Sequence, residues 1–343
     1  MRPGKIILFS FLVLLVAAAY VSWNFFGPTI QAPNGNYFYI HTGASYKEVK
    51  DSLKKEKMIG SDFWFEKVAS YSHYDKNIRP GKYKITDGMS IVGLVSMLRN
   101  GRQVPVNLII TKLRTKEDLA KKIGDNFETD SLSAIKFLNN NDSLRPFGVD
   151  TNTVLTIVIR NTYTYKWNTS ITSVLKKLYI EKKKFWNEDR EKKAKHLGLS
   201  PKEVYTLASI VEEETNRSED KGKIASVYIN RVRKGMKLAA DPTIKFAMKE
   251  FGLKRIYFKY LDYPSPYNTY IHKGLPPGPI NSPSINTIDA VLDEPQTNYL
   301  FFAARPNSGG LSDFSTTFSE HAAYAKRYRL ALDSLAQGNK ENQ

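Results

Sequence analysis

The sequence contains no cysteine and only five histidines, and these absences exclude two common kinds of chemistry. Without cysteine there is no disulfide, no thiolate nucleophile and no lipid attached to an N-terminal cysteine. The histidines show no ligand spacing such as HExxH, so we expect neither a metal site nor a cofactor. They are His41, His73, His196, His272 and His321.

Acidic residues are few relative to basic ones. The 343 residues include 51 lysines and arginines against 34 aspartates and glutamates, which gives a formal net charge of +17. Such a charge favours a polyanion, a membrane surface or an acidic polymer as partner and does not choose among them. Nucleic acid is not expected, because the sequence shows no zinc-finger spacing, RNP-like aromatic motif or recognition helix.

Long apolar runs are limited to one. Residues 6–26 are apolar except for two serines and an asparagine, and about 20 such residues cross a bilayer as a helix. We predict a single anchor in the inner membrane, with residues 1–5 in the cytoplasm because they are basic, and the rest of the chain in the periplasm. A core helix is one alternative, and cleavage after Ala17–Ala19 is another. The apolar run continues to an aromatic end at Phe26, which favours an uncleaved anchor.

The remaining sequence predicts an α+β fold in two parts. Residues 27–36 contain prolines and Asn-containing turns and are expected to form a linker. Residues 37–112 predict a small β-α-α-β-α unit, and residues 113–343 a larger domain. In the small unit we expect strands at 37–40 and after the turn at 79–81, and helices at 45–57, 63–70 and 90–99.

Later segments are less regular in composition. Residues 128–158 are rich in Asn, Ser and Asp and predict a surface excursion that ends in a strand at 153–158. Residues 171–195 predict one long helix with a solvated lysine face. Residues 236–283 are rich in Pro, Tyr and Asn and predict loops, where binding residues tend to lie. The other predictions are strands at 104–111 and 299–303 and helices at 115–126, 220–234, 289–292 and 319–337.

The best-marked element is a helix that begins at Ser200. Ser200 suits the N-cap position, Pro201 suits the first helical position, and Glu203 completes a capping box. Apolar residues then recur at spacings of three and four, which is the pattern of one buried helix face. They are Val204, Leu207, Ala208, Ile210 and Val211.

Three consecutive glutamates follow and point in different directions. At about 100° per residue, Glu214 lies roughly 50° from the centre of the apolar face, Glu212 roughly 110° and Glu213 roughly 150°. Glu214 is therefore directed inward. Burial disfavours the charged form of a carboxyl group and raises its pKa toward the range of a general acid at neutral pH. Glu212 and Glu213 are expected on a solvated face, as most glutamate runs on helices are.

Six segments around this helix form an ordered set. They are Ala208–Thr215 (ASIVEEET), Ile224–Arg231 (IASVYINR), Gly235–Leu238 (GMKL), Asp241–Thr243 (DPT), Tyr267–Tyr270 (YNTY) and Gly274–Gly278 (GLPPG). In order and spacing they resemble the MltG (YceG-like) endolytic murein transglycosylase family. Several motifs in the right order are more specific than one short motif. The resemblance spans nearly the whole chain and is strongest from Leu207 to Pro283.

The resemblance implies a LysM-like module at residues 37–112 that contacts glycan strands, followed by a YceG-like catalytic domain. It implies a carbon–oxygen lyase that acts on nascent peptidoglycan, beside peptidoglycan synthases (penicillin-binding proteins). Glu214 would protonate the leaving oxygen of the MurNAc–GlcNAc β-1,4 bond and then, as a base, take the proton of the C6 hydroxyl to close a 1,6-anhydro ring. The residues expected to contact substrate are Glu212, Asn230, Asp241, Thr243, Tyr267, Asn268, Thr269 and Pro277.

Several alternatives stay open on the sequence alone. Asp241 either takes part in catalysis, fixes a turn or caps the segment from Thr243, and the turn is favoured over catalysis. Tyr163 and Trp167 either stack on sugars or pack internally, and Lys82–Lys84 either contact glycan or form an exposed hairpin edge. Arg160 stands where the family usually has proline. At the level of function, a muramidase-type hydrolase and a non-catalytic wall-binding scaffold are the alternatives.

Overall fold

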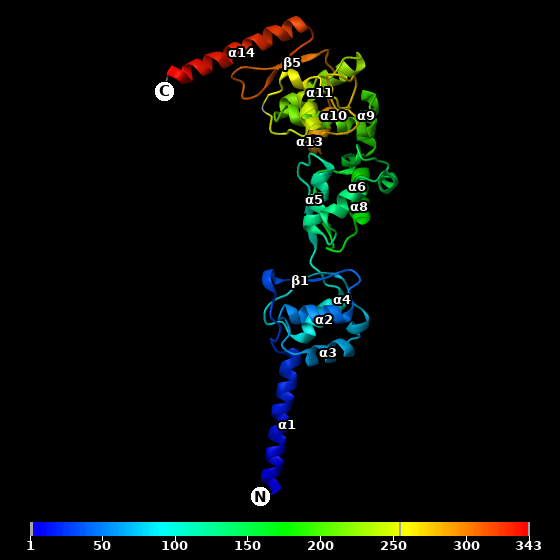
Figure 1. Ribbon diagram of the computed structural model, residues 1–343, viewed down its shortest axis with the longest axis vertical. Coiled ribbons are helices and arrows are strands. Elements are labelled where there is room, and N and C mark those ends of the chain that lie inside the picture. Colours follow the sequence, from blue (N-terminus) through cyan, green and yellow to red (C-terminus); the bar gives the residue numbers. More distant parts are fainter. Residues whose placement is uncertain (1–2, 254, 342–343) are drawn as a thin grey trace. The chain divides into compact units, whose positions relative to one another are not determined.

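The computed structural model describes residues 3–253 and 255–341, which form an α+β fold (Figure 1). Contacts divide the chain into two compact units. The first unit comprises Met1–Leu108, Ile123–Asp130 and Thr164–Ser170, and the second comprises Ile109–Lys122, Ser131–Tyr163 and Ile171–Gln343. Neither unit is one continuous segment, a feature that no sequence pattern indicated.

Helix α1 (Pro3–Phe26) is the element predicted as a membrane anchor. Its stretch Gly4–Phe26 has a mean hydropathy of 2.4 and is not buried within the structure. Length and composition allow this helix to cross a membrane, and its place near the N-terminus also fits a signal sequence. Residues 1–2 of the predicted cytoplasmic tail lie outside the described residues.

The first unit has the small β-α-α-β-α order that the sequence predicts. Its elements are β1 (Tyr37–Ile40), α2 (Tyr46–Lys55), α3 (Asp62–Tyr71), β2 (Gly81–Lys84) and α4 (Ile91–Asn100). Strands β1 and β2 pair antiparallel, with Phe38 opposite Tyr83. Tyr83 is fully buried in the core of this unit, and its hydroxyl donates to the Arg79 carbonyl at 2.8 Å. The exposed hairpin edge that the sequence allowed is therefore wrong for Tyr83.

Residues 27–36, which the sequence predicts as a linker, are held against the first unit. Ile30 is buried and forms a β-bridge with Met89. The backbone N–H of Ala32 donates to the Asp87 carboxylate at 2.6 Å. A 3₁₀ turn at Asn34–Asn36 then leads into β1. The segment therefore contributes a side chain to the core of the unit that it precedes.

The middle of the chain differs most from the predictions. Residues 128–158 are not a surface excursion, because their helices bury Leu138 and Leu144. The predicted strand at 153–158 is a 3₁₀ turn at Val154–Ile157 whose residues are all buried. A run buried on every side shows no alternation, so its β-branched residues cannot identify a strand. The helices are α6 (Ser131–Leu138) and α7 (Asn141–Leu144), followed by a 3₁₀ turn at Arg145–Phe147.

The long basic helix predicted at 171–195 is two helices, α8 (Ile171–Phe185) and α9 (Glu188–Leu197). The chain breaks at Trp186, which is buried, and at Asn187, whose side-chain oxygen accepts the Arg190 N–H at 3.0 Å. Asparagine is a strong N-cap residue, so a second helix begins here. Lysines on both sides of the break hid it in the sequence pattern.

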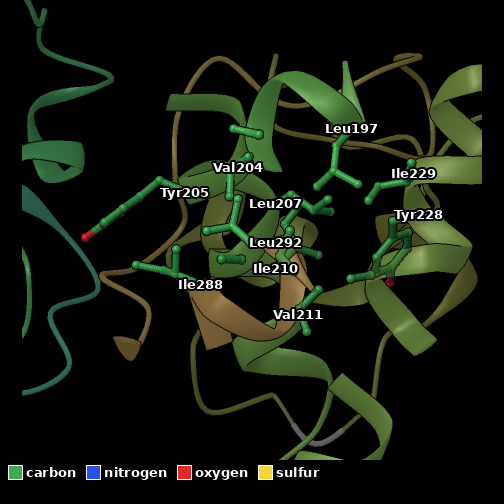
Figure 2. Close-up of a cluster of buried hydrophobic side chains, with 14 of the residues drawn as sticks. Leu197, Val204, Tyr205, Leu207, Ile210, Val211, Tyr228, Ile229, Ile288 and Leu292 are labelled. Carbon is green, nitrogen blue, oxygen red and sulfur yellow. The ribbon is translucent and has the colours of Figure 1, made fainter. Parts of the chain in front are cut away.

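Helix α10 (Pro201–Glu214) lies at the centre of the larger core. The predicted capping box of Ser200 and Glu203 is present. Figure 2 shows Val204, Leu207 and Ile210 of this helix among side chains from the neighbouring helices. Those neighbours include α11 (Ser218–Arg233), α12 (Asp241–Met248) and α13 (Ile285–Leu292), all in contact with α10. The core therefore fixes the direction of the glutamates at the end of α10.

The other elements are β3 (Val106–Ile109), α5 (Lys116–Asn126), β4 (Thr162–Tyr165), β5 (Phe301–Ala304), β6 (Ser312–Ser315) and α14 (Phe318–Glu341). Strand β3 pairs with β4, and β5 pairs antiparallel with β6; neither pairing was predicted from the sequence.

Tyr163 and Trp167 are both buried, which confirms internal packing rather than exposed stacking surfaces.

Candidate active site

Glu214 is the last residue of α10, and its carboxyl group has an unusual pKa. Tyr228 of α11 donates its hydroxyl to Glu214 Oε1 at 2.6 Å. Burial raises the pKa of Glu214 to about 7, and the negative charge of Asp241 acts in the same direction. The Tyr228 hydrogen bond and the cations Lys245 and Arg231 oppose this rise. A carboxyl group with this pKa can both give and take a proton near neutral pH.

Replacing Tyr228 by phenylalanine is expected to raise the pKa of Glu214 further. The hydroxyl stabilises the ionised carboxyl, and a hydrogen bond to a charged group is worth about one pH unit. The pH at which Glu214 loses its proton should therefore rise by about one unit, which an NMR titration of that carboxyl group would measure as a profile of chemical shift against pH. Tyr205→Phe is the control, because the buried Tyr205 hydroxyl donates to the Val158 carbonyl instead. A profile unmoved in Tyr228→Phe would contradict this role.

Asp241 supplies the second carboxyl group of this site. It is exposed and is the first residue of α12, with Ala240 as N-cap, so it lies at the start of the helix that contains Thr243. The Tyr270 hydroxyl donates to Asp241 Oδ1 at 2.6 Å. Because its charge acts on Glu214, the ends of α10 and α12 bring two carboxyl groups into one site.

Arg231 fixes the chain around this site. Its guanidinium donates to the carbonyls of Leu300 at 2.7 Å and Leu238 at 2.5 Å. Tyr228 and Arg231 are three residues apart on α11, and this spacing places them on one helix face. In the sequence both residues occur only within the Ile224–Arg231 motif, which does not by itself single out either of them.

Glu212 lies in a buried ionic network rather than on a solvated face. Its carboxylate pairs with Arg160 at 2.9 Å and Lys221 at 3.1 Å, and the Glu212 side chain is only 10% exposed. The hydroxyls of Ser284 and Thr287 also donate to it. Burial alone would raise the pKa of Glu212, but the Thr287 hydrogen bond and the two cations hold it below its ordinary value. The carboxylate therefore stays ionised and ties α10 to α11 and to the segments that contain Arg160 and Ser284.

Glu213 is also paired. Lys112 lies 2.7 Å from its carboxylate, and Asn281 Nδ2 donates to it at 3.0 Å. The prediction of a solvated face is thus wrong for both Glu212 and Glu213. The reason is that their partners come from segments far apart in sequence, which a helical periodicity cannot reveal.

Four of the polar residues predicted to contact substrate bind other parts of the chain. Asn230 Nδ2 donates to the carbonyls of Thr297 at 2.7 Å and Tyr299 at 3.0 Å. The other three are buried. Asn268 Nδ2 donates to the Leu261 carbonyl at 2.8 Å and to the Tyr263 carbonyl at 2.9 Å. The hydroxyls of Thr243 and Thr269 form a hydrogen bond with each other at 2.9 Å. These contacts let Asn230 hold the segment 297–299, while the other three shape the loops around α12.

Tyr267 and Pro277 lie closer to open space. Tyr267 is partly exposed and lines a cavity of about 290 Å³, and Pro277 is exposed on the Gly274–Gly278 loop. A Cβ at Gly278 would stand 2.2 Å from the Asn152 carbonyl oxygen and 3.2 Å from the Tyr267 hydroxyl, so only glycine fits. Among the described residues, no group of three or more metal-binding side chains gathers here or elsewhere.

Comparison of the sequence with known protein families identifies the family of this chain. The sequence profile of the YceG-like family matches residues 38–327. The chain belongs to the YceG-like family. The matched range includes α10, α11, α12 and every residue of the candidate site, and it begins after α1. The YceG-like match therefore covers most of both units and leaves out α1, residues 27–37 and the last part of α14 (Phe318–Glu341).

Two similar proteins carry the name endolytic murein transglycosylase. The one from Bacillus subtilis (strain 168) is 28% identical over 305 residues, which cover 84% of this chain and 83% of that protein. The one from Streptococcus pneumoniae (strain D39) is 26% identical over 339 residues, which cover 87% of this chain but only 60% of that protein. The crystal structure of a YceG-like protein from Listeria monocytogenes matches with a TM-score of 0.55 and 25% identity, over 84% of this chain and 99% of that one.

Proposed function

We propose that this YceG-like chain is a membrane-anchored lytic transglycosylase. It cuts nascent peptidoglycan strands internally at the MurNAc–GlcNAc β-1,4 bond and leaves 1,6-anhydroMurNAc ends. The observation that carries the proposal is the Glu214 carboxyl group, whose pKa is raised to about 7 at the end of a buried helix. Similarity to proteins named endolytic murein transglycosylase supports the substrate and the class of reaction.

One carboxyl group suffices for this reaction. Protonated Glu214 gives its proton to the glycosidic oxygen as the bond from that oxygen to C1 breaks. The Glu214 carboxylate then takes the proton of the C6 hydroxyl, and O6 bonds to C1, so the enzyme returns to its starting state without using water. The nearby charge of Asp241 stabilises the positive charge that develops on the sugar ring. The hydroxyl of Tyr228 orients the Glu214 carboxyl group throughout.

The other residues predicted to contact substrate do not take part in the proton transfers. Tyr267 and Pro277 contact the glycan strand. Asn230, Thr243, Asn268 and Thr269 hold the loops that line its path, because their hydrogen bonds lie within the chain. Glu212 keeps the end of α10 in place beside its cations.

Residues 37–112 act as a LysM-like module that contacts glycan. Tyr39 is 40% exposed on β1, and Lys82 Nζ lies 4.1 Å from the centre of the Tyr37 ring. Aromatic and cationic groups on one exposed strand pair suit the faces and polar edges of sugars. The helix α1 anchors the chain in the inner membrane with its N-terminus in the cytoplasm, so the catalytic domain works in the periplasm beside peptidoglycan synthases.

Product chemistry tests the proposal. Purified peptidoglycan is treated with the full-length chain in detergent, with Glu214→Gln as control, and the products are identified by mass spectrometry. Internal cuts with 1,6-anhydroMurNAc ends, absent from the control, are expected. Reducing ends would instead indicate a muramidase-type hydrolase, and no cleavage by either protein would indicate a wall-binding scaffold.

Release of the catalytic part from the membrane is expected to change product length. The anchor restricts how far the active site reaches along a strand that grows from the membrane, so a chain cut after Phe26 should produce a broader range of lengths. Chromatography of strands made and cleaved in membrane preparations measures the distribution. The rate on soluble strands should not differ between the two forms, and equal length distributions would contradict the role of the anchor.

A further inference from the structure

A groove in the first unit lies between the end of α1 and the helices α3 and α4. Its volume is about 770 Å³. Apolar walls come from Phe25 and Phe26 of α1, Tyr71 of α3 and Val95 of α4, with Ser96 beside them. The side chains of Lys67 and Arg99 belong to the same lining. The groove thus combines an apolar interior with two cations.

The length of α1 determines at which level of the membrane this groove lies. At about 1.5 Å per residue, the apolar residues 6–26 extend about 30 Å, which equals the thickness of a bilayer's hydrocarbon core. Phe25 and Phe26 therefore lie where the acyl chains meet the headgroups. Trp23 and Phe26 are 61% and 71% exposed, as expected of an interfacial aromatic belt. This placement rests on the anchoring proposed above.

Helix α3, which forms one wall of the groove, is packed closely against the end of α1. The Trp64 ring of α3 contacts the rings of Tyr20 at 6.1 Å and Phe25 at 5.1 Å between centroids. A Cβ at Gly27 would stand 2.4 Å from the Trp23 carbonyl oxygen, so the chain turns tightly as it leaves the helix. Helix α3 consequently stays at the membrane surface.

The exposed side chains of α3 and α4 suit that surface. Phe63 is 55% exposed and Tyr71 91% exposed. Lys67 and Arg99 are exposed, and neither has a carboxylate within ion-pair distance among the residues that the structure describes. The Lys67 ammonium lies 5.4 Å from the centre of the Phe63 ring. Cations without a carboxylate partner bind lipid phosphate groups at the level of the headgroups. Aromatic rings are common at the same membrane–water interface.

We propose that this groove binds one anionic phospholipid of the surrounding leaflet. The lipid phosphate lies between Lys67 and Arg99, and the first part of an acyl chain packs against Phe26 and Val95. The bound lipid holds the first unit against the membrane surface, which adds a second contact to that of the single helix.

Native mass spectrometry of the full-length chain in detergent tests this proposal. The chain is titrated with phosphatidylglycerol and, separately, with phosphatidylcholine. One phosphatidylglycerol molecule is expected to bind at least about fivefold more tightly than phosphatidylcholine. The double variant Lys67→Glu, Arg99→Glu should lose this preference, and Ser96→Trp, which fills the groove without changing charge, should weaken binding of both lipids.

A charge-matched control separates the groove from general attraction. Lys47 and Lys55 are exposed on α2 and outside the groove, so Lys47→Glu, Lys55→Glu should keep the preference. Equal losses in both double variants, or full binding in Ser96→Trp, would overturn the proposal. Loss of residues 1–26 from the purified chain, read from the same spectra, would overturn the anchoring itself. An intact chain without lipid preference would overturn the groove alone, and neither result depends on peptidoglycan cleavage.

Discussion

Replacing Glu214 by glutamine is expected to lower the rate of strand cleavage by a factor of about 10³ or more. Glutamine cannot supply the proton to the glycosidic oxygen, nor can it remove the proton of the C6 hydroxyl. It can still accept the Tyr228 hydroxyl, so the site keeps its shape. The measurement is the initial rate of release of soluble products from purified peptidoglycan.

The matched control is Glu219→Gln, at an exposed carboxylate in the first turn of α11. It removes the same charge close in sequence and should leave the rate unchanged. Retention of more than a tenth of the activity in Glu214→Gln would show that another group is the acid, and Asp241 would then be the next residue to test.

The substitution Glu214→Gln is also expected to stabilise the folded chain at alkaline pH. The folded-state pKa of Glu214, about 7, is above its ordinary value of 4.5. Its contribution to stability is therefore fully present below pH 4.5 and is lost as the pH rises to 7, while glutamine has no such dependence. The difference between the two proteins should grow across this window, toward an upper limit of about 3 kcal/mol. Thermal unfolding at pH 4.5 and pH 8 measures it, and a difference independent of pH would contradict the raised pKa.

Replacing Glu212 by alanine is expected to destabilise the second unit by about 3–5 kcal/mol. The change leaves Arg160 and Lys221 beside each other, largely buried and without their shared carboxylate. It also removes the acceptor of the Ser284 and Thr287 hydroxyls. The free energy of unfolding, from denaturant titration followed by circular dichroism, is the measurement.

Glu188→Ala is the control for this change. Glu188 pairs with Lys192 at 2.7 Å on α9, where the two side chains are 83% and 72% exposed. An exposed pair of this kind is worth about 0.5 kcal/mol or less. If both substitutions cost the same small amount, the network around Glu212 does not hold the end of α10 in place.

Local patterns predicted the elements of the first unit and the start of α10. The capping box of Ser200 and Glu203 and the three-and-four spacing of Val204, Leu207 and Ile210 depend only on residues within one helix, so the sequence suffices to find them. The inward direction of Glu214 follows from the same spacing. Elements without such signals were missed, as at Asn187, where a capping residue interrupts a continuous lysine pattern.

The sequence by itself determined the direction in which each of the three glutamates leaves α10, because the direction of a side chain on a helix is set by its own position. Only the tertiary structure decided what surrounds each carboxyl group. Burial raises the pKa of Glu214 against the opposing hydrogen bond of Tyr228. The Thr287 hydrogen bond and the cations Arg160 and Lys221 lower the pKa of Glu212, two residues away. These partners come from other segments of the fold. Electrostatic interactions depend on distance in space, which a single sequence does not contain.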